Sequence, residues 1–213
     1  MKSLEFVRHL GSVRASAILR TSIAEAAAPA MSAAERAGFR IVEFTLTTPN
    51  ALDRIAEFST HEDLVVGAGT VLTVAEARSA VAAGARFLVS PVVDEAVIET
   101  ARSLDIAAIP GCQTPTELLR AHRAGAPLQK LFPAPGGGPD YLKACLGPLP
   151  FLKVVPTSGV DAGNVRDWLE AGAWAVGFVN VLFEPEDLAA GRFDAVERRG
   201  RRLLEKVSAA TRT

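Results

Sequence analysis

The chain has 213 residues, of which 49% are hydrophobic, and its formal net charge is −1 because 23 lysines and arginines nearly balance 24 aspartates and glutamates. Such a balance argues against a nucleic-acid-binding protein. No apolar run approaches the ~18 residues of a membrane helix, and residues 1–12 lack the apolar core of a signal peptide. Cys112 and Cys145 are too few for a disulfide framework or a metal cluster. We therefore expect a cytoplasmic protein that acts on a small molecule and binds neither membrane nor nucleic acid.

Short apolar or β-branched segments alternate with longer segments rich in Ala, Glu and Arg along the whole chain. The short segments are residues 12–19, 41–46, 64–72, 87–91, 106–112, 128–133, 152–159 and 175–180. They are apolar on both faces, which is typical of parallel strands that are covered by helices.

The segments between the predicted strands carry the signals of helix ends. Thr73 is a predicted N-cap, and Glu76 stands at the capping-box position. An Ala-Gly pair closes several of these segments, at Gly38, Gly84, Gly125 and Gly172, where a left-handed residue is favoured after a helix. The recurrence indicates a repeated helix–strand unit.

Eight such units in this length predict a closed (β/α)8 TIM barrel that forms a single domain, residues 1–213, with a short N-terminal helix. An open doubly wound sheet is the alternative. Its dinucleotide fingerprint needs three glycines, and GAGTVL at residues 67–72 has only two of them.

Lys130 is the one charged residue in the apolar stretch APLQKLFPAP. In a barrel of this kind the catalytic groups lie at the carboxyl ends of the strands. Lys130 either reaches solvent at its strand end or points inward, where burial lowers the pKa of the amine and favours imine formation. Lys153 lies early in its own strand, near the other end of the barrel, and is interpreted as structural.

Glu43 and Arg20 are the other two candidate functional residues that the strand pattern provides. Glu43 is alone among apolar neighbours, so it is either a proton carrier with a raised pKa or the buried ion-pair partner of a lysine. Arg20 directly follows the first strand and can clamp a carboxylate or cap the next helix. The three histidines, His9, His61 and His122, are not at metal-ligand spacing. Lysine, glutamate and arginine without a metal suggest carbonyl chemistry through an imine, with no cofactor.

A series of motifs in this order resembles the class I aldolases that act on 2-keto-3-deoxy-6-phosphogluconate and 4-hydroxy-2-oxoglutarate. The motifs are AILR, VEFTLTTP, GAGTVL, VSP, IPGCQTPTE, KLFPA, PTSGV and AVG, and they span nearly the whole chain. The resemblance implies cleavage of 2-dehydro-3-deoxy-6-phosphogluconate to pyruvate and glyceraldehyde 3-phosphate, and of 4-hydroxy-2-oxoglutarate to pyruvate and glyoxylate. It also implies a homotrimer.

The resemblance assigns roles to individual residues. Lys130 becomes the imine-forming lysine and Glu43 the general acid/base, with Phe132 beside the imine. Some relatives hold the substrate carboxylate with an arginine at the position of Thr47, and others with one at the position of Arg20, which is the arrangement expected for this chain. The resemblance implies further substrate-binding residues at Thr70, Pro91, Thr157, Ser158, Gly159 and Asn180.

The predicted phosphate site departs from the family pattern. The family usually has PTGG followed one strand later by Gly-Ser, whereas this chain has PTSG and then Val179 and Asn180. Phosphate nests bind mainly through backbone N–H groups, so a phosphorylated substrate remains the expectation. The alternatives are an aldolase for an unphosphorylated 2-keto-3-deoxy acid, a phosphate-barrel isomerase or synthase without imine chemistry, and a non-catalytic binding barrel with Glu43 and Lys130 as a closed ion pair.

Overall fold

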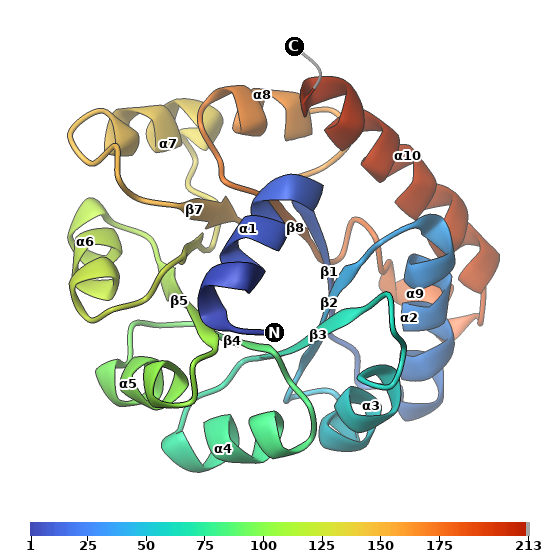
Figure 1. Ribbon diagram of the computed structural model, residues 1–213. Coiled ribbons are helices and arrows are strands. Elements are labelled where there is room, and N and C mark those ends of the chain that lie inside the picture. The colour runs from blue at the N-terminus through green and yellow to red at the C-terminus, as the bar shows by residue number, and fades with distance from the viewer. Residues whose placement is uncertain (212–213) are drawn as a thin grey trace.

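Eight parallel strands form one sheet that curves into a barrel, and helices surround it (Figure 1). The computed structural model describes residues 1–211, so residues 212–213 of the predicted domain lie outside the described part. The strands are β1 (Ala15–Leu19), β2 (Ile41–Thr45), β3 (Val65–Gly69), β4 (Phe87–Ser90), β5 (Ala107–Cys112), β6 (Gln129–Leu131), β7 (Val154–Pro156) and β8 (Val176–Phe178). The helices are α1 (Ser3–Val13), α2 (Ala24–Ala37), α3 (Ala51–Phe58), α4 (Val74–Ala82), α5 (Glu95–Ser103), α6 (Pro115–Arg123), α7 (Gly138–Leu146), α8 (Val165–Glu170), α9 (Pro185–Ala189) and α10 (Phe193–Thr211).

The order of the strands is β7-β6-β5-β4-β3-β2-β1-β8, and every pairing is parallel. A parallel bridge between Thr157 and Gly177 and a hydrogen bond from Trp174 N–H to Val154 O bring β7 and β8 together. The predicted single-domain (β/α)8 barrel is therefore confirmed, and the open doubly wound sheet is wrong.

The predicted local signals are also confirmed. Thr73 caps α4, and Glu76 completes the capping box. The four glycines of the Ala-Gly pairs have φ angles of +115°, +109°, +98° and +102°, in chain order Gly38, Gly84, Gly125 and Gly172. The start of the first strand is wrong: the predicted strand began at residue 12, but α1 continues to Val13 and is capped by Arg14, whose φ is 59°.

The short N-terminal helix α1 crosses one opening of the barrel (Figure 1). Phe6 stacks on Phe87 at the start of β4, with their ring centroids 4.5 Å apart, and both belong to a buried cluster that also includes Leu10 and Ile41. This plug closes the amino ends of the strands, so the carboxyl ends form the open side. No helix within residues 1–211 is long and apolar enough to cross a membrane.

Candidate active site

Lys130 is the central residue of β6 and points into the barrel. Only 7% of the residue is exposed, so the interpretation of Lys130 as a solvent-reaching strand end is wrong. In register beside it on β5 lies Gly111, where a Cβ would come within 2.2 Å of the Pro91 carbonyl oxygen. The ammonium nitrogen lies 4.8 Å from the centroid of the Phe132 ring. Burial lowers the pKa of this amine, the charge of Glu43 raises it in part, and the charge of Arg20 lowers it further.

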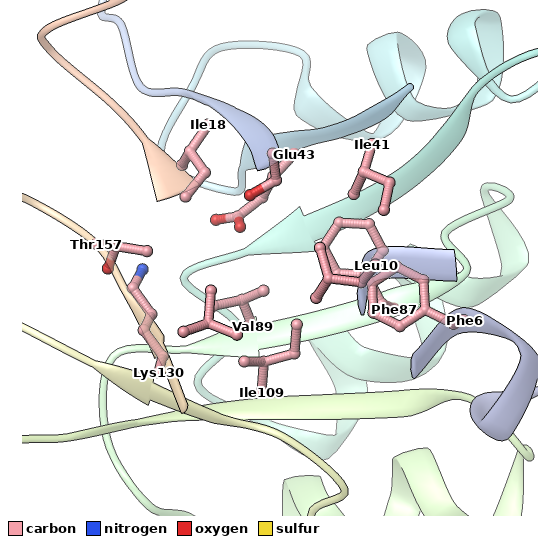
Figure 2. A pocket seen from close by; sticks show the side chains of 12 residues that line it. Phe6, Leu10, Ile18, Ile41, Glu43, Phe87, Val89, Ile109, Lys130 and Thr157 are labelled. Carbon is pink, nitrogen blue, oxygen red and sulfur yellow. The ribbon is translucent and has the colours of Figure 1, made fainter. Parts of the chain in front are cut away.

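Glu43 extends into the interior from β2, on the opposite side of the barrel from β6 (Figure 2). It is 2% exposed, and its Oε1 atom has no hydrogen-bond partner among the described residues. Burial raises the pKa of the carboxyl, and the charges of Lys130 and Arg20 oppose that rise. Gly69 on neighbouring β3 leaves room for this carboxylate, because a Cβ at that position would come within 1.8 Å of Oε1.

Lys130 and Glu43 face the same interior cavity without closing into an ion pair. None of the ion pairs within residues 1–211 joins them, although each shifts the pKa of the other. Thr157 lies beside the amine in Figure 2, and its buried Oγ1 atom also has no partner among the described residues. The site therefore holds an amine, a carboxyl and a hydroxyl that are free to meet a substrate.

The open side of the barrel carries a second pocket above the amine. Its lining residues are Ile18, Arg20, Lys130, Phe132, Ser158, Gly159, Val160, Val179, Asn180 and Val181. Arg20 donates a hydrogen bond from Nη2 to Thr70 Oγ1 at 3.2 Å. The pocket thus joins the lysine and the arginine to the two loops in which the sequence predicts a phosphate site.

Three predicted substrate-binding residues, Thr47, Thr70 and Pro91, line neither pocket, and Thr70 meets the site through the hydrogen bond that it accepts from Arg20. Thr47 shares a neighbouring hollow with Arg20, and its hydroxyl is hydrogen-bonded to Thr45 at 3.0 Å. Pro91 follows β4, and its carbonyl lies against Gly111 on β5. No contact with Lys130 like that of Phe132 places these three residues at the amine, and the roles of all the site residues stay predictions.

Sequence reasoning missed Ser16 and Ile18 among the residues that line the interior and the mouth. Ser16 lines the interior cavity, and Ile18 lines both pockets. The signal was available, because side chains on a strand alternate and residues 16, 18 and 20 share one face. Counting back from Arg20 along β1 identifies both.

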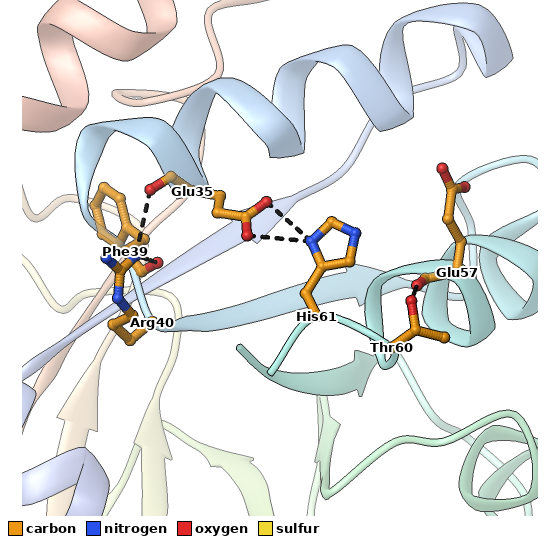
Figure 3. A network of polar contacts seen from close by, with 6 residues as sticks. All are labelled: Glu35, Phe39, Arg40, Glu57, Thr60 and His61. Atoms are coloured by element: carbon orange, nitrogen blue, oxygen red, sulfur yellow. Dashed lines mark hydrogen bonds and ion pairs between the residues drawn. The ribbon is translucent and has the colours of Figure 1, made fainter. Parts of the chain in front are cut away.

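Lys153, which was interpreted as structural, and His61 both make contacts away from the two pockets. Lys153 Nζ lies 5.3 Å from the ring centroid of Trp174, outside both pockets. His61 Nδ1 lies 3.1 Å from each carboxylate oxygen of Glu35 on α2, on the outside of the barrel (Figure 3). Residues 1–211 contain no group of three or more His, Cys, Asp or Glu side chains that could hold a metal ion.

Comparison with known proteins agrees with this geometry. A family model described as KDPG and KHG aldolase matches residues 8–199. The KHG/KDPG aldolase of Escherichia coli K12 is 34% identical over 191 residues, which are 85% of this chain and 86% of that protein. A native KDPGal structure superposes with a TM-score of 0.85 at 28% identity and covers 93% of this chain and 96% of that one.

A second solved structure is the KDPG aldolase of Legionella pneumophila with pyruvate captured at low pH as a covalent carbinolamine intermediate. It has a TM-score of 0.82 and 28% identity, and it covers 91% of this chain and 97% of that one. The residues that match the family model include all eight strands and every residue that lines the two pockets except Phe6. The chain belongs to the KDPG and KHG aldolase family.

Proposed function

We propose that the protein is a class I aldolase that cleaves 2-dehydro-3-deoxy-6-phosphogluconate to pyruvate and glyceraldehyde 3-phosphate through an imine on Lys130. The observation that carries this proposal is the buried amine of Lys130, which faces the buried carboxyl of Glu43 without pairing with it. A lowered pKa leaves more of the amine neutral near pH 7, and the neutral amine is the form that attacks a carbonyl.

In the proposed reaction Lys130 adds to C2 of the keto acid, and loss of water from the carbinolamine gives a protonated imine. Removal of the proton from the C4 hydroxyl breaks the C3–C4 bond, and the electron pair of that bond moves into the iminium to form an enamine of pyruvate. The aldehyde leaves, C3 is protonated, and hydrolysis returns pyruvate and the free amine. No other electron acceptor is required.

Glu43 is proposed to carry the protons of these steps. Its raised pKa lets the carboxyl hold a proton closer to neutral pH than an exposed glutamate can, so it both donates and accepts. The same site would cleave 4-hydroxy-2-oxoglutarate to pyruvate and glyoxylate, since that substrate has the same keto acid end.

Arg20 is proposed to clamp the carboxylate next to the reacting carbonyl. Its charge reaches both Glu43 and Lys130, and Thr70 holds its guanidinium at the mouth. We expect Arg20→Ala to weaken binding of pyruvate and of every 2-keto acid substrate alike. Loss of a charge-assisted contact costs about 1.5–3 kcal/mol, or roughly ten- to a hundredfold in affinity.

Inhibition by pyruvate and the KM values for two substrates that differ beyond C4 measure this effect. Thr47→Ala is the matched control, because Thr47 lies beside Arg20 in the neighbouring hollow. Unchanged pyruvate affinity in Arg20→Ala, with weaker affinity in Thr47→Ala, would transfer the clamp to Thr47.

The far end of the pocket supports a phosphorylated substrate. Ser158 and Gly159 have successive positive φ angles of 62° and 102°. The backbone N–H groups of Gly159, Val160, Asn180 and Val181 find no acceptor among the described residues. Groups of N–H donors in such turns form anion-binding concavities, so a phosphate can bind here without a lysine or arginine of its own.

A panel of substrates tests the proposed function. We expect release of pyruvate from 2-dehydro-3-deoxy-6-phosphogluconate with a much higher kcat/KM than from its unphosphorylated twin, because remote binding energy helps to hold the reacting bond in place. Val179→Gly with Asn180→Ser restores the common family pattern and should change this preference only modestly. If the native enzyme treats the two substrates equally and the double variant creates a preference, the chain is adapted to an unphosphorylated keto acid.

The homotrimer and the cytoplasmic location stay predictions. Two large apolar side chains are exposed just after adjacent strands, Leu72 after β3 and Val92 after β4, at 50% and 55% exposure. Exposed apolar residues on one rim of the barrel are candidates for a contact between subunits.

A further inference from the structure

The loop between β7 and α8 is braced by the side chain of Asn164. Its Nδ2 atom donates to the carbonyl of Gly159 at 2.8 Å, and its Oδ1 atom accepts from the N–H of Asp161 at 2.9 Å. The carboxylate of Asp161 in turn accepts from the N–H groups of Gly163 at 2.7 Å and Asn164 at 3.1 Å. One side chain thus holds the peptide groups on both sides of Val160.

This brace determines where the N–H of Val160 points. The carbonyl of Gly159 and the N–H of Val160 belong to one planar trans peptide, so they point in opposite directions. Gly159 and Val160 line the pocket at the mouth of the barrel, whereas Asn164 does not. Because Asn164 draws the carbonyl away from the pocket, the N–H, which has no acceptor among residues 1–211, is directed toward it.

The loop needs such a brace because its backbone is unfavourable. Ser158 has a φ of 62°, a region that residues with a side chain rarely occupy, and it is followed directly by Gly159 with a φ of 102°. A rotation of the Gly159–Val160 peptide would turn the free N–H away from the pocket. The hydrogen bond from Asn164 to the Gly159 carbonyl opposes that rotation.

We propose that Asn164 is a positioning residue for the phosphate end of the substrate, and that it acts by aiming the backbone N–H of Val160 without touching the substrate. This inference rests on the proposed function, because it assumes that a phosphate binds at the loops after β7 and β8. The proposed role of Asn164 differs from that of Ser158 and Asn180, because these two residues line the pocket themselves and Asn164 does not.

Two variants of Asn164 test the proposal. Asn164→Ala removes both hydrogen bonds of the side chain. Asn164→Asp keeps the acceptor for the Asp161 N–H but replaces the donor to the Gly159 carbonyl with a carboxylate oxygen, which repels that carbonyl. For both variants we expect kcat/KM for the phosphorylated substrate to fall ~tenfold or more, the size of one weakened charge-assisted hydrogen bond.

The unphosphorylated analogue of the substrate is the internal standard for these measurements. Its kcat/KM should be unchanged in both variants, because it makes no use of the phosphate site, and its turnover also shows that the variant is folded. Inorganic phosphate should compete with the phosphorylated substrate in the native enzyme and should inhibit its cleavage less in the two variants. If Asn164 served folding alone, the variants would lower kcat/KM for both substrates by the same factor.

Arg166→Ala is the matched control. Arg166 is on α8, within two residues of Asn164, and pairs with Glu170 at 2.6 Å on the exposed side of the helix. It should leave the preference for the phosphorylated substrate unchanged.

The proposal is overturned if Asn164→Ala and Asn164→Asp keep the native preference for the phosphorylated substrate. It is also overturned if they lower kcat/KM for both substrates in the same proportion. Failure of both variants to fold would overturn it as well, since the brace would then be structural. A native enzyme without any preference would show instead that the phosphorylated substrate itself is the wrong assignment, and the inference would fall with it.

Discussion

Lys130→Ala is expected to abolish aldol cleavage while the protein stays folded. Among residues 1–211, Lys130 supplies the only amine that lines the interior cavity, and no other lining side chain from this part of the chain can form an imine. The folded-state pKa of Lys130 is lowered, so its charged form costs stability at neutral pH, and that cost disappears with the amine. Release of pyruvate from the substrate measures the activity, and thermal unfolding measures the fold.

Lys153→Ala is the matched control for the loss of a lysine. Lys153 precedes β7 and packs on Trp174, so its variant should keep nearly all activity. An inactive Lys153 variant beside an active Lys130 variant would exchange the two roles. Appreciable cleavage by Lys130→Ala alone would rule out the imine mechanism.

Glu43→Gln is expected to lower the rate by ~10²–10⁴-fold, the usual contribution of a positioned general acid/base. Glutamine keeps the shape of the side chain, but it cannot carry a proton between the steps of the reaction. Imine formation with pyruvate should slow as well, because loss of water from the carbinolamine needs a proton. Single-turnover rates and kcat at several pH values measure both effects.

The stability of the Glu43→Gln variant is a second, independent test of the raised pKa of Glu43. Burial raises the folded-state pKa of Glu43, so its contribution to stability is present at low pH and is lost as the pH rises through that pKa. The variant should therefore gain stability relative to the native protein toward neutral pH, unless loss of the charge partner of Lys130 offsets the gain. Near-native turnover at neutral pH would assign the proton transfers to another group.

The strands were predictable because burial on both faces and the recurring Ala-Gly helix ends are local signals. The exact ends of the strands were less predictable. Val13 suits a buried helix face as well as a strand, and the left-handed turn at Arg14 that separates α1 from β1 has no glycine to mark it. The third predicted strand ran through Thr70, but the strand ends at Gly69 and Thr70 turns with a φ of 58°.

The candidate site also combines residues that the sequence predicts with a feature that it does not predict. Alternation along the strands and the rule of carboxyl ends identified Lys130, Glu43 and Arg20, which the fold brings to one site. The brace at Asn164 was not predictable, because it depends on the path of a loop after β7 and on contacts with backbone groups, which leave no pattern in the side chains.

Reduction with borohydride in the presence of pyruvate tests the central claim most directly. The reagent converts an imine into a stable secondary amine, and peptide mass spectrometry locates the added carboxyethyl group. We predict that the group is found on Lys130 in the native protein and in Lys153→Ala, and that Lys130→Ala gains none. A native protein that gains no mass, or one that carries the group on another lysine while Lys130 stays unmodified, would contradict the proposed aldolase mechanism.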